Sequence, residues 1–511
     1  MRKRIIILLL SSLLLNVIVS AQNDSLPIID IRKKITENSS LVIDFAGRTL
    51  FNPANKYKLY DYRMTDLKIG AEYEHQDEAL VVQKGDGYVD AYLDINTYIP
   101  LKDYSFWGGV KYKNGERKNV RFNETSDYSL LYPYLMGDTI GGDMKSEVYY
   151  FSGGYAQKRG LWTWGAEADL RALQEYRGVD PRPKNTSTTL NISLGAALQL
   201  PFDYNLAFSL RGRKYKQTNE LSFYNELGKP NVYHYTGLDT DYARFRGSND
   251  QTHYKGHLFG ADISFLPIDK SGFSANLSYD YFTFEKIIKN LNELPMAKAS
   301  DRDVKAELVY LNSSHPTLSR GVKIDAQFLN RRGTENIFGD PANNNYQQIM
   351  TIDMYEHQVT NLSLSGFLEK KESNGIFWSL MPTLTYLDME ESYVNPKKTI
   401  LYKHLVGTLS AGLNHSFGKF YLKTGIYIKY THALDSKIDL GSQDFKNFLA
   451  PEIVHNYMIA SKDNTQIGIN PQIGYKLKNN YLIYLGAEWH YGRYTDNINA
   501  CCSIVNIGAY F

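Results

Sequence analysis

The segment Phe273-Ser274-Ala275-Asn276-Leu277-Ser278-Tyr279-Asp280-Tyr281 decides the fold, because it alternates apolar and polar residues without a break. A period of two places alternate side chains on opposite faces of a β-strand, so this strand has one apolar and one polar face. Similar segments of about ten residues recur nearly to the end of the chain, where the last one stops on Phe511. This repetition predicts an all-β protein, a transmembrane antiparallel β-barrel of about 18 strands (16–18).

The N-terminus has the three parts of a secretory signal peptide. A basic start, Met1-Arg2-Lys3-Arg4, precedes an apolar run that ends at Leu15 and a small-residue cleavage site, Val19-Ser20-Ala21. The alternative is an anchor helix, but the apolar run is shorter than the ~20 residues that a spanning helix needs. The chain is therefore divided into a signal peptide (1–21), an N-terminal periplasmic or plug-like segment (22–64) and an outer-membrane barrel (65–511). Its predicted location is the outer membrane of a Gram-negative bacterium.

Composition agrees with a barrel and argues against several other classes. Tyr supplies 41 of 511 residues, and aromatic residues can form girdles at the membrane surface, while the mean hydropathy of −0.40 reflects the polar lumenal faces. Without Arg2, Lys3 and Arg4 the formal charge falls from +2 to −1, which gives no electrostatic basis for binding nucleic acid. The only cysteines, Cys501 and Cys502, are adjacent and lack further ligands nearby, so we expect no metal and no cofactor.

The charges test the assignment of faces. Residues with the parity of Leu206, Phe208 and Leu210 are expected to face lipid, and charged residues interleaved with such sets have the opposite parity. A Lys or Arg that faces lipid at mid-membrane would cost ~2–4 kcal/mol, so the segregation is what a bilayer requires. The predicted lumen-lining residues are Arg211, Arg213, Asp280, Lys323, Lys423, Glu488 and His490.

Connections alternate in length, which predicts short periplasmic turns and long extracellular loops. The short turns are expected near residues 101–104, 158–160, 201–203, 267–271, 370–374, 418 and 478–480. The long loops are expected near residues 114–145, 176–187, 218–251, 286–300, 333–354, 390–399 and 434–461. Ile29 to Thr36 predicts a short helix before the barrel, and Pro382 and Pro471 predict β-bulges inside strands.

Several residues suggest recognition, each with a plainer alternative. Loop aromatics can stack on sugars, flat cofactors or partner proteins, or can fold inward as a constriction. Arg211 and Arg213 share one lumenal face and could draw anions inward, although solvated wall charges are the default. The candidate loop-recognition residues are Tyr233, His234, Tyr235, Asp180 and Arg182. For Asp180 and Arg182 the alternative is a stiff surface turn.

Two groups of residues raise the question of catalysis, and neither predicts an enzyme. His415 and Ser416 are adjacent strand residues that face opposite ways, so they cannot readily form a nucleophile and base pair. Glu488 and His490 share a lumenal face, but a rim protease would need a second such pair. A surface hydrolase is therefore the least favoured of the functions considered. Its first test is whether His490→Ala loses hydrolysis.

Three stretches carry a resemblance to a known family: Gly141-Gly142-Asp143 leading into Glu147 to Tyr155, Asp180-Pro181-Arg182-Pro183, and Thr334 to Gly339. The chain resembles outer-membrane β-barrels of Bacteroidota that belong to an uncharacterised (domain-of-unknown-function) family. Such barrels often accompany TonB-dependent uptake systems, although this chain has fewer strands than the ~22 of TonB-dependent receptors. Asn52-Pro53-Ala54 also looks like a motif near the start of outer-membrane fatty-acid transporters.

Together these observations favour uptake of small solutes or nutrients, through a channel or as an accessory to a TonB-dependent importer. The alternative is an interaction barrel that docks surface lipoproteins or secretion components. Expected partners are outer-membrane lipid, the barrel-assembly machinery through C-terminal Phe511, and either a TonB-dependent receptor or a surface lipoprotein.

Overall fold

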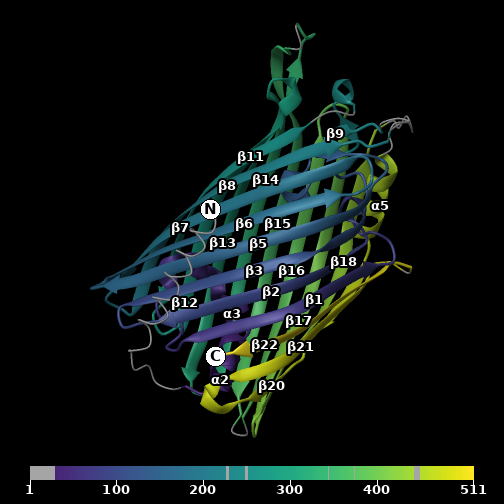
Figure 1. Cartoon of the computed structure of the whole chain (residues 1–511). Coiled ribbons are helices and arrows are strands. Elements are labelled where there is room, and N and C mark those ends of the chain that lie inside the picture. The colour runs from purple at the N-terminus through teal and green to yellow at the C-terminus, as the bar shows by residue number, and fades with distance from the viewer. Residues whose placement is uncertain are drawn as a thin grey trace, which may run out of the picture.

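The computed structural model describes residues 29–225, 230–247, 251–342, 345–372, 375–441, 449–495 and 497–511. The predicted signal peptide lies outside these residues. The sheet has 19 labelled strands, and β19 and β20 count as one because each pairs with β18 on one side and β21 on the other. The protein is thus a closed antiparallel barrel of 18 strands, as predicted (Figure 1).

The barrel strands follow one another in chain order. They are β1 (Met64–Gln76), β2 (Gly87–Pro100), β3 (Tyr104–Val120), β5 (Gly142–Arg159), β6 (Trp162–Arg177), β7 (Arg182–Gln199), β8 (Tyr204–Ser222), β11 (Thr252–Pro267), β12 (Gly272–Ile288), β13 (Leu294–His315), β14 (Leu318–Phe338), β15 (Gln348–Lys371), β16 (Ile376–Tyr393), β17 (Lys398–Phe417), β18 (Phe420–Asp439), β19 (Asn464–Ile469), β20 (Gln472–Lys476), β21 (Leu482–Arg493) and β22 (Asn499–Tyr510).

The remaining elements lie in the N-terminal segment and the connections. A small sheet contains β4 (Met136–Gly137), β9 (Tyr233–Gly237) and β10 (Thr240–Asp241). The α-helices are α2 (Ile31–Asn38), α3 (Val42–Ala46), α4 (Tyr128–Leu131) and α5 (Ala450–Ala460), and the 3-10 helices are η2 (Gly47–Phe51), η3 (Pro53–Lys56), η4 (Val82–Lys84), η5 (Ala243–Phe245), η6 (Lys289–Leu291) and η7 (Lys478–Asn480). Among the described helices, none has the length and apolar character needed to cross a membrane.

The barrel closes through its first and last strands. β1 pairs with β22 from Asp66↔Tyr510 to Gln76↔Ala500. The backbone N–H of Thr65 donates to the Phe511 carbonyl at 2.7 Å, and the N–H of Phe511 donates back to the Thr65 carbonyl at 3.1 Å. Neither terminal strand is left with an unpaired edge in this ladder.

The two faces of the wall are separated as predicted. The outward side chains of Phe208, Ile324 and Leu485 are 49%, 54% and 55% exposed, which is unusual for large apolar groups unless lipid covers them. Charged residues of opposite parity, such as Arg211, face the lumen and pair there with other wall residues. The fold is that of an outer-membrane β-barrel.

The short turns lie where they were expected, but several extracellular loops are shorter than predicted. The expected long loop 176–187 is only the connection 178–181 between β6 and β7, and the expected loop 286–300 is reduced to residues 289–293. β14 and β15 have 21 and 24 residues, whereas ~9–11 suffice to span a bilayer. Beyond the membrane neither face of a strand meets lipid, so the strands continue without the alternation that made them recognisable.

The two strand prolines behave differently. Pro471 separates β19 from β20, and the Asn470 side chain accepts the N–H of Gly425 at the break. Pro382 was expected to cause a bulge, and this prediction was wrong, because it pairs with Leu409 without a register shift. No pair with β15 is formed at residues 381 and 382, so the missing N–H of the proline falls on that side.

Candidate functional site

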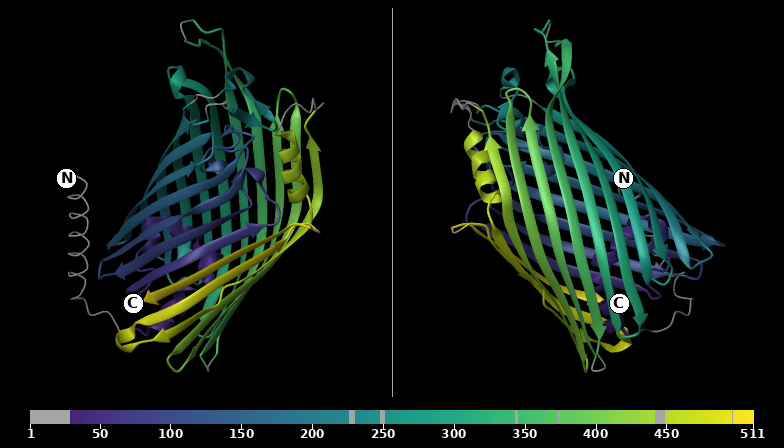
Figure 2. Two further views of the ribbon diagram at one scale, coloured as in Figure 1. Left: turned by 45° about the vertical axis from the view of Figure 1, so that its right-hand side comes forward. Right: turned by 180° about the vertical axis from the view of Figure 1, so that it is seen from behind.

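The end of the lumen that carries the short turns contains residues 29–63, which we call the N-terminal segment. Figure 2 shows its purple helices inside the lower part of the barrel. The Asp30 side chain caps α2 by accepting the N–H of Arg32 at 2.9 Å, which satisfies a helix N-terminus. Ile31 and Ile35, one turn apart, then lie on one face. That face packs against wall residues that include Tyr421, Leu482, Tyr484 and Tyr510.

The middle of the N-terminal segment contacts another sector of the wall. Phe45 of α3 stacks on Phe367 of β15 with ring centroids 5.0 Å apart. Arg48 forms ion pairs with Asp325 at 2.9 Å and Glu307 at 3.9 Å, on β14 and β13. The segment is therefore held by aromatic packing and by charge.

The end of the segment fits against glycines of a third sector. The Asn52 side chain accepts the N–H of Ala54 at 2.9 Å and starts η3. A Cβ atom at Gly195 would lie 1.9 Å from Asn52 Oδ1, and one at Gly165 would lie 2.4 Å from the Ala54 nitrogen. These glycines of β7 and β6 make room for the chain, so the segment crosses the lumen from β18–β22 to β6 and β7.

At the extracellular end, residues 121–141 fold inward, and we call them the inner loop. Its Leu131, Tyr134 and Met136 side chains are fully buried. The hydroxyl of Tyr254 donates to the Tyr134 carbonyl at 3.0 Å, and the Lys286 ammonium donates to the Leu135 carbonyl at 2.6 Å. Strands β11 and β12 thus attach the inner loop to the wall.

Further anchors hold the start of α4 and the turn after it. Asp127 accepts hydrogen bonds from Arg171 at 2.8 Å and from Ser187 and Tyr215 at 2.9 Å each, on β6, β7 and β8. On the other side, Arg331 of β14 donates to the Tyr132 carbonyl at 2.6 Å. The inner loop therefore spans the lumen between opposing wall sectors.

A buried charged cluster fixes both ends of the inner loop. Arg177 of β6 donates to Asp138 at 2.6 Å and lies 3.6 Å from Glu124, and all three side chains are fully buried. Asn185 and Asn219 donate to the Glu124 carbonyl at 2.7 and 2.8 Å. Burial, together with the neighbouring Asp138 carboxylate, raises the pKa of Glu124 well above its usual range.

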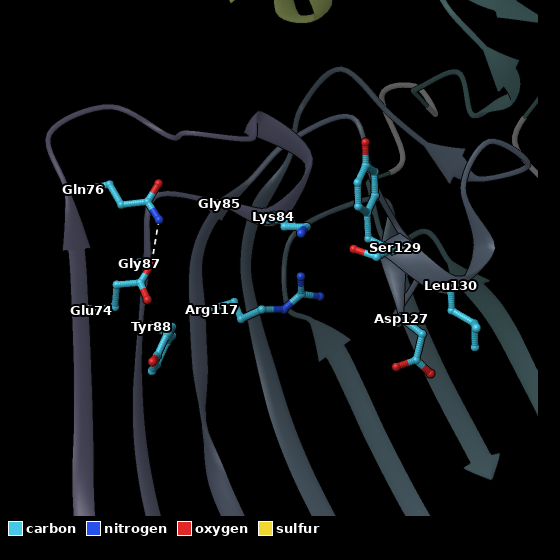
Figure 3. Close-up of a pocket in the computed structure, with 11 residues that line it drawn as sticks. Glu74, Gln76, Lys84, Gly85, Gly87, Tyr88, Arg117, Asp127, Ser129 and Leu130 are labelled. Carbon is cyan, nitrogen blue, oxygen red and sulfur yellow. Dashed lines mark hydrogen bonds between the residues drawn. The ribbon is translucent and has the colours of Figure 1, made fainter. Parts of the chain in front are cut away.

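A cavity of about 500 Å³ lies between the inner loop and the extracellular ends of β1, β2 and β3 (Figure 3). Arg117 is held by Glu175 through two contacts of 2.7 Å, whereas Lys84 has no ion pair among the described residues and lies 5.8 Å from the Tyr128 ring. The cavity therefore presents a cation, carboxylates and aromatic rings. It is lined by Glu74, Gln76, Lys84, Gly85, Gly87, Tyr88, Arg117, Asp127, Tyr128, Ser129 and Leu130.

Some of the predicted lumen-lining residues meet in the structure. Arg211 contacts Asp262 and Asp280 at 2.9 Å each, and Glu488 lies 3.7 Å from His490. The others do not form one cluster: Arg213 donates to Asn191 at 2.7 Å, Lys323 lies 3.9 Å from Glu307, and Lys423 is on β18. Their role in selectivity stays a prediction.

The predicted loop-recognition residues are placed mainly in structural contacts. His234 is fully buried, Tyr235 is 6% exposed, and the Tyr233 ring stacks on Tyr235 with centroids 6.0 Å apart, so these aromatics take the inward arrangement. Asp180 and Arg182 form an ion pair of 2.7 Å beside the loop of residues 223–225.

Sequence reasoning missed the inner loop and the cavity. One signal was available, since Leu130-Leu131 and Tyr134-Leu135-Met136 form apolar groups inside a predicted surface loop and need burial. No group of three or more His, Cys, Asp or Glu side chains suited to a metal ion is found in the part of the chain that the structure describes.

These features define an outer-membrane β-barrel with inward-folded segments at both ends of its lumen. The chain belongs to a family of unknown function, DUF6850, whose model matches residues 53–511. No curated protein matches the sequence.

Two solved structures illustrate the similarity of fold. The ferric preacinetobactin receptor BauA of Acinetobacter baumannii has 6% sequence identity and a TM-score of 0.39, with 88% of this chain and 80% of that chain covered. A variant of the ferric enterobactin receptor PfeA of Pseudomonas aeruginosa has 9% identity and a TM-score of 0.38, with the same coverage. At such low scores the similarity carries no argument about the solute.

Proposed function

We propose that the protein takes up small polar solutes across the outer membrane, as a gated channel or as an accessory to a TonB-dependent importer. The observation that carries this proposal is the occupation of a charged lumen at both ends by segments of the same chain, each attached by non-covalent contacts. A barrel of this strand number can enclose an aqueous channel, so displacement of these segments would open a path.

The cavity beside the inner loop supports capture of a solute before passage. It has the size of small-molecule sites and combines apolar rings with a few charged groups that can orient a ligand. Lys84 is the cation most available to a solute, because Arg117 is already held by Glu175.

Planar-bilayer recordings test the gate. Tyr254→Phe with Lys286→Met removes two donors to the inner loop, and we expect open time to rise several-fold over the wild type. The matched control is Tyr430→Phe with Lys429→Met on β18, which removes a hydroxyl and a wall charge away from the inner loop. If the Tyr254→Phe, Lys286→Met variant is folded but shows no more conductance than a non-conducting wild type, the result would contradict a channel.

An interaction role has one observation in its favour. The hairpin of β14 and β15 extends past the other strands, and its Ile337, Ile349 and Met350 side chains are 42%, 65% and 50% exposed (Figure 1). A lipoprotein or secretion component docked there should co-purify in mild detergent and be lost in Ile349→Ser with Met350→Ser. Recovery of the barrel alone in both cases would count against this role.

The remaining assignments belong to the same proposal. The signal peptide ends at Ala21, the N-terminal segment acts as a plug, Phe511 presents the chain to the barrel-assembly machinery, and the source is a member of the Bacteroidota. We assign no catalytic activity, and the support is that His415 and Ser416 lie on opposite faces of β17 while Glu488 and His490 form a single pair.

A further inference from the structure

The outer wall carries a group of basic side chains just above its apolar band, on strands β8, β11, β13 and β14. On β8 they share the parity of Phe208 and Leu210, so they point away from the lumen. All are exposed. We call this group the basic patch: Lys214, Lys216, Lys255, His257, Lys298, Arg302 and Arg332.

The register places two lysines of the basic patch directly opposite one another. Lys216 faces Lys255 across the β8–β11 ladder, and Lys214 faces His257. Like charges at facing positions destabilise a sheet. Glu285 faces both Lys255 and Lys298 across the ladders, and Glu220 lies further along β8. Within the described strands, Lys214, Lys216 and Arg302 face no carboxylate on either neighbouring strand, so these three side chains carry the uncompensated positive charge. An arrangement of this kind favours an anion outside the protein.

Few members of the basic patch are neutralised by the protein itself. Among the described residues, Lys255 lies 3.9 Å from Glu293 and Arg332 lies 3.5 Å from Glu356. Lys214, Lys216, Lys298 and Arg302 have no carboxylate within ion-pair distance in the same part of the chain.

Two outward lysines on other sectors of the wall pair with acids. Lys118 lies 2.6 Å from Glu116 and 2.8 Å from Asp143 on the side of β3 and β5. Lys403 of β17 lies 3.5 Å from Asp388 of β16. Lys118 and Lys403 therefore differ from Lys214, Lys216 and Arg302 of the basic patch, which have no such partner in the part of the chain that the structure describes.

The height of the basic patch corresponds to the outer surface of the membrane. Lys214 lies ten residues along β8 from Tyr204, which follows a periplasmic turn. With a tilt of about 35–45°, a strand rises about 2.5 Å per residue along the membrane normal, so Lys214 lies about 25 Å above that turn. This distance equals the height of the apolar band of such barrels.

We infer that the basic patch binds the phosphate groups of an anionic glycolipid in the outer leaflet. Lysine ammonium groups bind phosphate as point charges, and clusters of Lys and Arg at a membrane surface attract anionic headgroups. A lipid fits better than a soluble anion because the basic patch continues directly into apolar wall. Phe259, Val304 and Phe328 lie below it on the same strands, 71%, 37% and 50% exposed, where acyl chains would cover them. This binding does not depend on what passes through the lumen.

Native mass spectrometry of the full chain in mild detergent, titrated with bisphosphorylated lipid A, tests the inference. We expect the wild type to bind it, and Lys214→Gln with Lys216→Gln and Lys255→Gln to weaken binding about tenfold or more. The control, Lys118→Gln with Lys145→Gln and Lys403→Gln, removes the same charge elsewhere and should retain wild-type affinity. The heat-induced mobility shift of each protein on gels verifies that its barrel is folded.

Three further probes separate the sources of phosphate. Dephosphorylated lipid A should bind at least about tenfold more weakly than the bisphosphorylated form. Equal affinity for phosphatidylglycerol would overturn the assignment to a glycolipid, and equal affinity for pyrophosphate would replace it with a soluble anion. Equal losses of lipid A affinity in the basic-patch and control variants would show that the basic patch is not the binding site.

Discussion

A few buried side chains hold both ends of the inner loop: Arg177, Asp138 and Glu124. Arg177 neutralises one carboxylate at 2.6 Å and lies 3.6 Å from the other, in a region without solvent access. Two ionised carboxylates beside one guanidinium would leave a net negative charge buried, which is costly. Burial and the Asp138 carboxylate therefore raise the pKa of Glu124, while Arg177 and Lys286 oppose this rise.

Replacement of Arg177 tests how much the buried charged cluster stabilises the closed inner loop. Arg177→Met leaves Asp138 buried without its partner, and we expect the closed inner loop to lose about 3–5 kcal/mol. Limited chymotrypsin digestion should then cleave after Tyr134 in a barrel that is still folded. Arg182→Met is the matched control, because its pair with Asp180 is partly exposed and contributes little. Equal protection of Tyr134 in Arg177→Met and the wild type would contradict the role of the cluster.

The same cluster predicts a dependence on pH. The pKa of Glu124 is raised above its ordinary value of 4.5 when the inner loop is closed, so the closed form binds the proton more tightly than the released form. Its stability is therefore highest in acid and falls as the pH rises above about 4.5. The groups that act on Glu124 are Asp138, Arg177 and Lys286.

In bilayer recordings, channel open time should increase between pH 5 and pH 9 in the wild type. Glu124→Gln keeps a neutral group at all pH values, so its open time should be low and independent of pH. A wild type and a Glu124→Gln variant with the same pH profile would show that another group titrates.

At the scale of elements, the strands were predictable from sequence and the inward loops were not. Lipid imposes a period of two on each strand, and that period is local and visible. The contacts of the inner loop are not local, since Lys286 and Leu135 are separated by 151 positions and Arg177 and Asp138 by 39. The short helix predicted at Ile29 to Thr36 corresponds to α2, whose cap and apolar spacing lie within a few residues of one another.

The contact between the N-terminal segment and the wall predicts a steric effect. Gly195→Ala places a Cβ atom 1.9 Å from Asn52 Oδ1, so we expect a loss of about 1–3 kcal/mol of stability. The measurement is the midpoint of thermal unfolding in detergent. Gly212→Ala on β8 is the control, because nothing lies within 4 Å of its Cβ position. Asn52→Ala should restore part of the loss in Gly195→Ala; no change in any of these variants would mean that the segment is loosely held.

At the scale of the whole molecule, the lumenal charges are distributed in compensating groups. Arg211 lies between Asp262 and Asp280 at 2.9 Å each, and Lys113 between Glu72 and Asp90 at 2.6 and 2.8 Å. A passing ion therefore meets paired charges more often than isolated ones, which weakens any preference for its sign.

The opened channel should accordingly discriminate little between potassium and chloride. The reversal potential of the Tyr254→Phe, Lys286→Met protein in a KCl gradient should lie near zero. Adding Arg211→Gln leaves Asp262 and Asp280 uncompensated and should shift that potential toward cation selectivity. A strong anion preference before this change would show that Arg213 or other wall cations dominate.

The pairing of β1 with β22 also determines when the barrel can close. Residue 66 pairs with residue 510, so the ring cannot close before the segment that forms β22 is present. Until then both ladder edges are exposed, and such edges readily join other chains. A chain interrupted upstream of β22 would remain an open sheet, and its two free edges could join those of other copies.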